Sequence, residues 1–215
     1  LTLANALNIE SFSISSEVAM GSLASALQVK LLVWIFVMRI LMIVTSVVAF
    51  WINGAITKMK YQHAEDLDFE KPLTSLVWIT SILSIVVTFI ASYILLAALP
   101  INIWITLSVI ISAGTLGAAL IPEFTKLFTS PKSTHVAEVV EASKKGGASL
   151  NILSGLVAGN FSAFWKGMVF FLLMFIAYYA STFGLENFMV YPSIFAFGLV
   201  AFGMLGMGPV IIAVY

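Results

Sequence analysis

The sequence contains no cysteine, and charged residues make up only 9% of its 215 residues. Without cysteine the chain has no disulfide framework, no thiolate nucleophile and no thiolate metal site. Soluble globular domains carry about 25% charged residues. A hydrophobic fraction of 61% and a mean hydropathy of +1.08 therefore predict an integral membrane protein in a lipid bilayer. The ten basic and ten acidic residues balance, so nothing in the charge favours nucleic acid as a partner.

Apolar runs dominate the chain from residue 31 onward. Five of them are long enough to cross about 30 Å of hydrocarbon at 1.5 Å per residue. They lack the period-2 polarity of membrane β-strands, so we expect helices. The runs are 31–53, 73–99, 103–128, 150–180 and 191–215. The predicted fold class is all-α, a polytopic transmembrane helix bundle with about five membrane-spanning helices.

The two ends of the chain differ from those of a complete membrane protein. The first residue is Leu1 rather than Met, and Tyr215 stands inside an apolar run without a cap or a polar turn. We therefore expect an internal segment of a longer polypeptide. Residues 1–30 are expected to lie outside the bilayer core, and residues 31–215 to form the transmembrane block.

Lysines are concentrated in two of the connections between the runs. The connections near 54–72 and 129–149, with the helix end that precedes the second, hold most of them, whereas the opposite side has only Lys30. The positive-inside rule makes these two loops cytoplasmic and residues 1–30 extracytoplasmic.

Small and hydroxyl residues recur at helical spacing in three runs, and such faces favour close packing against other helices rather than lipid. The second run contains Ser81, Ser84, Thr88 and Ser92, and the third contains Ser108, Ser112, Thr115, Ala119 and Glu123. The fourth contains two neighbouring rows: the glycine ladder of Asn151, Gly155, Gly159, Ala163 and Gly167, and beside it Ser154, Ala158, Ser162 and Lys166. The helices are therefore expected to belong to a larger bundle with a polar interior.

Three charged residues lie within or at the ends of the runs and are candidates for an ion pathway. Glu123 is either a coupling carboxylate or an interface residue paired with Lys126, because an unpaired charge at mid-bilayer costs about 2.5–3.5 kcal/mol. Arg39 and Lys166 either pair with carboxylates of helices outside this chain or extend to water at the membrane surface.

Lys144, Lys145 and Ser149 stand where the fourth run begins. Free backbone amides and two ammonium groups would favour an anion there, although a capped helix start with positive-inside charge explains the same residues. His63 and His135 have no ligand-spaced companions, so we expect both on solvated loops.

Three stretches resemble the membrane-embedded, ion-pumping inorganic pyrophosphatases. They are GAALIPEFTKLFTS, HVAEVVEASKKGGASLNILSGLVAGNFSAFWKG and FAFGLVAFGMLGMGPVIIAV, and they cover close to half of the chain. Glu123 matches the glutamate of a helix-end motif of that family. Tyr215 stands where many members have an aspartate.

The resemblance implies a homodimeric protein of about sixteen helices in a prokaryotic cell membrane. It also implies hydrolysis of magnesium-bound pyrophosphate, coupled to outward movement of protons or sodium ions. The acidic motifs that bind Mg²⁺ and pyrophosphate in the family are absent from this sequence, so the segment alone is expected to be inactive. The sequence does not decide between the two ions or indicate a potassium requirement.

Two other functions remain open from the residues alone. A secondary transporter would also have polar stripes and glycine-interrupted helices, but it predicts related halves, and no internal repeat is found. A purely structural membrane subunit leaves Arg39, Glu123 and Lys166 without a role.

Overall fold

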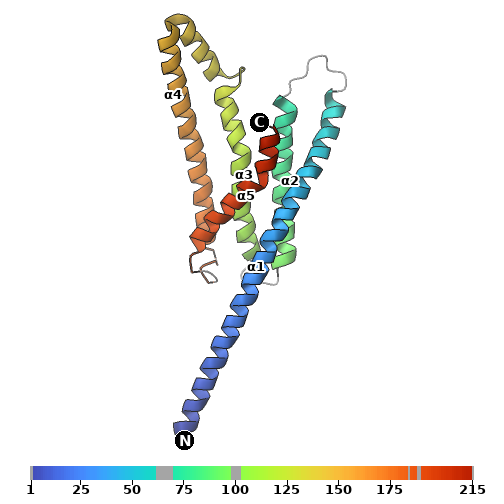
Figure 1. The fold of residues 1–215 in the computed structure, drawn as a ribbon, viewed down its shortest axis with the longest axis vertical. Helices are drawn as coiled ribbons and strands as arrows, with labels where there is room; N and C mark the ends of the chain where they lie inside the picture. Colours follow the sequence, from blue (N-terminus) through green and yellow to red (C-terminus); the bar gives the residue numbers. More distant parts are fainter. Residues whose placement is uncertain (1, 62–69, 98–102, 184, 188–189, 215) are drawn as a thin grey trace. The chain divides into compact units, whose positions relative to one another are not determined.

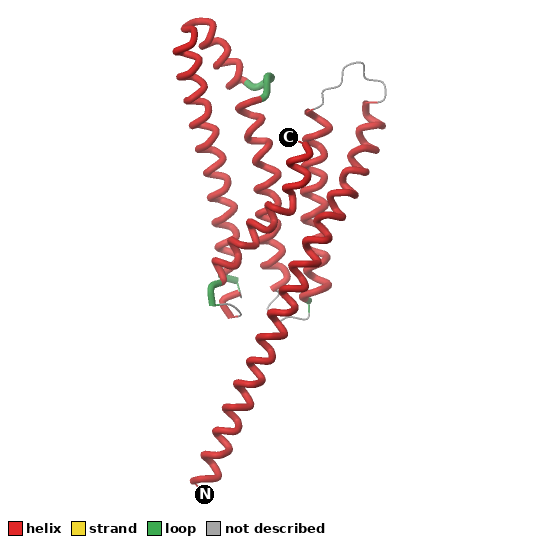
Figure 2. The backbone as a smooth tube through the Cα atoms, viewed as in Figure 1, coloured by secondary structure: helices red, strands yellow, loops and turns green. Residues whose placement is uncertain are grey.

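The computed structural model describes residues 2–61, 70–97, 103–183, 185–187 and 190–214, and throughout these ranges the chain is helical or in turns (Figures 1 and 2). The α-helices are α1 (Thr2–Tyr61), α2 (Glu70–Leu96), α3 (Ile103–Thr129), α4 (Thr134–Ser181) and α5 (Pro192–Val214), with a short 3₁₀ helix η2 (Leu185–Asn187). The all-α prediction is confirmed. The acidic part of the expected loop near 54–72, residues 62–69, lies outside the described residues.

Four stretches of the described chain are long and apolar enough to cross a membrane: Leu27–Lys60, Glu70–Leu96, Ile103–Ser181 and Pro192–Val214. The third contains both α3 and α4, which are joined by the turn at residues 130–133. The five expected runs thus correspond to parts of five helices.

The described parts of two predicted loops are largely helical. Within 54–72, α1 continues to Tyr61 and α2 already begins at Glu70. Within 129–149, α4 begins at Thr134, so the expected loop is a four-residue turn followed by helix. Ser133 caps this start, since its side chain accepts a hydrogen bond from the His135 amide at 3.3 Å. The lysines and glutamates of residues 134–146 favoured the prediction of a loop, but these residue types are also good helix formers.

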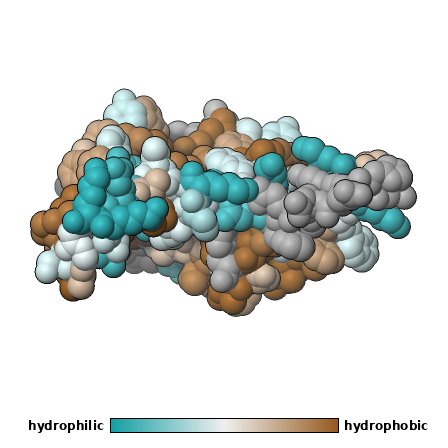
Figure 3. Space-filling view, turned by 90° about the horizontal axis from the view of Figure 1, so that it is seen from above, coloured by the Kyte–Doolittle hydropathy of each residue, from teal (hydrophilic) through white to brown (hydrophobic). Residues whose placement is uncertain are grey.

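Gly147 interrupts α4 and turns the chain back on itself. Its φ of 60° and ψ of −148° lie in a region that residues with a side chain rarely adopt. Residues 134–146 and 148–181 therefore form two helical arms, visible at the upper end of α4 in Figure 1. Figure 3 shows hydrophilic side chains gathered at this end of the molecule, beside hydrophobic flanks.

The chain divides into two compact units, Leu1–Ile40 and Leu41–Tyr215. The first is the N-terminal part of α1. In the second, α3 lies at the centre and packs against α2, α4 and α5. A cluster of buried apolar side chains joins α1, α2, α3 and α5 in this unit: Ala49, Leu76, Val77, Ala118, Ala119, Met207 and Val210.

Glycine allows α3 and α5 to cross at backbone contact distance. A Cβ atom at Gly114 would lie 2.1 Å from the carbonyl oxygen of Val200, and one at Gly203 would lie 2.4 Å from that of Ile111. Close approach through small residues is a common way for membrane helices to associate, because lipid supplies no hydrophobic driving force between them.

Candidate functional site

Glu123 follows Pro122 near the C-terminal end of α3 and contacts one residue of α2 and one of its own helix. The indole Nε1 of Trp78, on α2, donates a hydrogen bond to Oε1 of Glu123 at 3.2 Å. Nζ of Lys126, one turn further along α3, lies 3.8 Å from the same oxygen. The side chains of Glu123 and Lys126 are 29% and 19% exposed, so this carboxylate is partly withdrawn from solvent and faces two donors.

The two donors explain how a carboxylate is tolerated at the end of an apolar helix. A hydrogen bond to a charged group contributes about 1.5–3 kcal/mol, which offsets part of the cost of withdrawing the carboxylate from water. Sequence reasoning anticipated the ion pair with Lys126 but missed Trp78. The sequence did hold a sign of this contact, because the indole N–H of a tryptophan inside a membrane helix, such as Trp78, normally finds a hydrogen-bond acceptor.

A cavity of about 540 Å³ opens beside Glu123 at the α3–α4 turn. Its walls combine one carboxylate, two lysines, a histidine and several hydroxyl groups. The lining residues are Glu123, Phe124, Lys126, Leu127, Ser130, Lys132, Ser133, Thr134 and His135. Ser130 also lies 3.4 Å from both carboxylate oxygens of Glu70, which connects the turn to the first residue of α2.

His135 is not the solvated loop residue that the sequence predicts. Its ring stacks on Phe128 with 4.8 Å between centroids and an interplanar angle of 17°, and Nδ1 lies 3.6 Å from Oε2 of Glu138. Phe161, from the second arm of α4, approaches to 6.0 Å. The histidine therefore links the end of α3 to both arms of α4. The other lone histidine, His63, lies outside the described residues.

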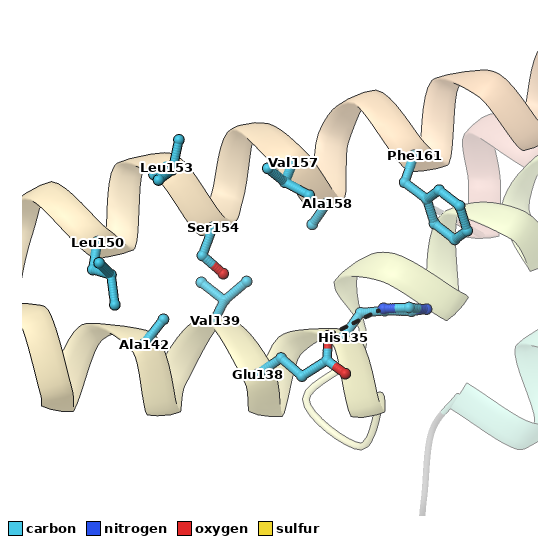
Figure 4. A pocket seen from close by; sticks show the side chains of 10 residues that line it. All are labelled: His135, Glu138, Val139, Ala142, Leu150, Leu153, Ser154, Val157, Ala158 and Phe161. Atoms are coloured by element: carbon cyan, nitrogen blue, oxygen red, sulfur yellow. Dashed lines mark ion pairs between the residues drawn. The ribbon is translucent and has the colours of Figure 1, made fainter.

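A second cavity, of about 400 Å³, separates the two arms of α4 (Figure 4). Val139 and Ala142 project into it from the first arm, opposite Leu153, Ser154 and other residues of the second. His135 and Glu138 close one end. Most of the lining is apolar, so this space suits hydrocarbon better than ions.

The anion site proposed from the sequence is divided by the helix break. Lys144 and Lys145 belong to the last turns of the first arm, whereas Ser149 belongs to the start of the second. Nζ of Lys145 lies 2.6 Å from Oε1 of Glu141, one turn earlier in the same arm. The two lysines are therefore near the end of one helix, where cations are favoured, and not at the start of another.

Lys166 is not brought to Glu123 by any contact that the structure describes, and Arg39 belongs to the other compact unit of the chain. Arg39 is half-buried in the first unit, and Lys166 is half-buried on the second arm of α4. Neither forms an ion pair with a described residue. Lys166 continues the row of Ser154, Ala158 and Ser162, which is half-buried to buried.

The glycine ladder lies on an open surface of the second unit. Asn151, Gly155, Gly159, Ala163 and Gly167 are all exposed within this chain. A Cβ atom built on Gly155, Gly159 or Gly167 would have no described atom within 4 Å. Packing of the ladder against other helices thus stays a prediction.

Comparison with known proteins gives a family match and one detailed similarity. A protein-family model described as "Inorganic H+ pyrophosphatase" matches residues 5–215. The K(+)-insensitive pyrophosphate-energized proton pump of Chlorobaculum tepidum is 58% identical over 190 residues, which make up 88% of this chain and 25% of that protein. The chain therefore spans about a quarter of the length of this relative. No solved structure matches.

Proposed function

Because the chain belongs to the inorganic H+ pyrophosphatase family, we propose that it forms part of a membrane pump in which hydrolysis of inorganic pyrophosphate drives proton translocation. The main support is its 58% identity with a protein named as a pyrophosphate-energized proton pump. That name favours protons over sodium ions and activity without potassium. It also favours the pump over a secondary transporter or a structural subunit.

The distribution of lysines supports a cytoplasmic location for the end of the bundle that holds Glu123. Contacts of Glu70 with Ser130 place the start of α2 beside the end of α3. Lysines of the second unit cluster at this end and along the first arm of α4: Lys58, Lys60, Lys71, Lys126, Lys132, Lys144 and Lys145. By the positive-inside rule this end faces the cytoplasm, and residues 1–30 lie on the other side.

Within this pump we assign Glu123 the role of coupling residue. Its carboxylate is held by Trp78 and Lys126 and borders a cavity of about 540 Å³, so a proton can reach it from the cytoplasmic side. Intramembrane carboxylates with named partners are a common feature of proton relays.

The residues described here do not fit the Mg²⁺ site that the family resemblance implies. Mg²⁺ requires oxygen ligands, usually carboxylates together with substrate phosphates. Among the described residues there is no group of three or more His, Cys, Asp or Glu side chains that could hold a metal ion. We therefore assign binding of Mg²⁺ and pyrophosphate to other parts of the polypeptide. This segment would supply scaffold and Glu123 and be inactive alone, in a homodimer within a prokaryotic cell membrane.

Pyrophosphate-driven acidification of sealed vesicles tests the proposal. The intact polypeptide is expressed, inverted vesicles are prepared, and hydrolysis and lumen acidification are followed with Mg²⁺ in buffers that contain choline, K⁺ or Na⁺. We expect both activities in all three buffers, with acidification abolished by a protonophore. A strict Na⁺ requirement would contradict the proton assignment. Vesicles that do not hydrolyse pyrophosphate at all would contradict the pump.

A further inference from the structure

The two oxygens of the Glu123 carboxylate lie in different surroundings. Oε1 accepts a hydrogen bond of 3.2 Å from the indole Nε1 of Trp78 and lies 3.8 Å from Nζ of Lys126. Oε2 receives no hydrogen bond from the residues that the structure describes. The protein therefore holds this side chain by one oxygen and leaves the other available.

The helices on both sides of this hydrogen bond are firmly packed. Val77, which precedes Trp78 on α2, is 1% exposed, and Ala119, about one turn before Glu123 on α3, is 0% exposed. Both belong to the buried apolar cluster that α2 and α3 share. Neither helix can move far from the other here without disturbing that cluster. Such rigid support is what a residue needs if it is to fix the position of another side chain.

The cavity of about 540 Å³ at the α3–α4 turn reaches the carboxylate from a different side than the indole does. Glu123 and Lys126 line this cavity, whereas Trp78 is not one of the described residues that line it. Oε2 is also not one of the buried polar atoms that lack a partner, so it is accessible to solvent. The oxygen that Trp78 does not hold is therefore the one that is open to the cavity.

Protonation makes the two oxygens of a carboxyl group chemically different. One becomes a hydroxyl, which donates a hydrogen bond, and the other becomes a carbonyl oxygen, which accepts. Because Oε1 already accepts from Trp78, the proton binds more favourably to Oε2. The hydrogen bond from Trp78 then persists in both protonation states, although it is stronger to the charged carboxylate than to the neutral acid.

We propose that Trp78 is a positioning residue for Glu123: by holding Oε1 it makes Oε2 the oxygen that binds and releases the proton, and it keeps Oε2 at the cavity in both protonation states. The proton is exchanged between Oε2 and water that enters the cavity, and no other bond forms or breaks. The effect of Trp78 on coupling rests on the proposed pump function. The assignment of the proton to Oε2 does not depend on it.

Vesicle assays of the intact polypeptide separate positioning from packing. Trp78→Phe keeps an aromatic ring without a donor, whereas Trp78→Gln keeps an N–H donor but fills less space. We expect the ratio of protons taken up to pyrophosphate hydrolysed to fall about fivefold in Trp78→Phe, as for loss of one ordinary hydrogen bond, and to fall less in Trp78→Gln. Trp104→Phe should keep the parent ratio. An unchanged ratio in Trp78→Phe, or an equal or larger loss in Trp78→Gln, would overturn the positioning role.

Infrared difference spectra of the purified intact protein test the assignment of the proton without any pumping. Acidification produces a carbonyl band for each newly protonated carboxyl group, and the band that is missing in Glu123→Gln belongs to Glu123. A carbonyl that accepts a hydrogen bond absorbs at lower frequency than a free one, so this band should move to higher frequency in Trp78→Phe and stay in place in Trp104→Phe.

An unmoved band in Trp78→Phe, or the absence of any band that depends on Glu123, would overturn the assignment of the proton to Oε2. If the parent protein shows no pyrophosphate-driven proton uptake, the proposed pump function fails. The infrared comparison still decides in that case which oxygen of Glu123 carries the proton.

Discussion

The indole of Trp78 and the carboxylate of Glu123 are joined across the α2–α3 interface by a hydrogen bond of 3.2 Å. The contact aligns the two helices at the end where the lysines of α3 and its turn are found. The proposed coupling role of Glu123 therefore depends on its hydrogen bond with Trp78.

Replacing Trp78 with phenylalanine should weaken this arrangement without emptying the space. Phe keeps an aromatic ring but has no donor for Glu123, so we expect a loss of about 1 kcal/mol in stability, because the carboxylate is partly exposed and retains Lys126. Differential scanning calorimetry of the purified variant measures this loss of stability. Trp104→Phe is the control, since Trp104 meets Tyr93 by its ring. Equal losses in the two variants would show that the Trp78 hydrogen bond is unimportant.

Gly114→Ala should disrupt the crossing of α3 and α5. Its Cβ would lie 2.1 Å from the carbonyl oxygen of Val200, and a backbone atom cannot move aside as a flexible side chain can. Separating the helices would cost about 1–3 kcal/mol, as overpacking generally does. Gly54→Ala, with no atom of the described residues within 4 Å of the added Cβ, should be neutral or stabilising. The two variants are compared by their yield and melting temperature in detergent. A Gly114→Ala variant with the yield and melting temperature of the parent would contradict the close crossing of α3 and α5.

Gly159→Leu tests whether the glycine ladder contacts helices outside the described residues. If it does, leucine cannot fit, and we expect the amount of folded protein in membranes to drop several-fold, which quantitative blotting after detergent extraction measures. Phe171→Leu is the control, because Phe171 is 68% exposed and leucine suits lipid equally well. Normal accumulation of Gly159→Leu would mean that the ladder faces lipid.

The apolar runs and the stripes of the second and third helices were readable from sequence, because hydropathy and spacing are local properties. Ser81 and Ser112 are buried as that pattern predicts. The Trp78–Glu123 pair was not predictable, since it depends on the register between two helices. Nor was the arm before Gly147, because its lysines and glutamates suit a solvated loop and a solvated helix equally well. His135 was misjudged because its neighbour Phe161 is 26 residues away in sequence and comes close only through that turn.

Coupling through Glu123 is the central claim, and the Glu123→Gln variant of the intact pump tests it most directly. Glutamine keeps an acceptor for Trp78 but cannot carry a proton, so we expect proton uptake per pyrophosphate hydrolysed to fall about tenfold or more, a change of at least about 1.4 kcal/mol. Glu138→Gln, at an exposed position of α4, should keep the parent ratio. If Glu123→Gln hydrolyses pyrophosphate and takes up protons in the parent ratio, Glu123 has no coupling role.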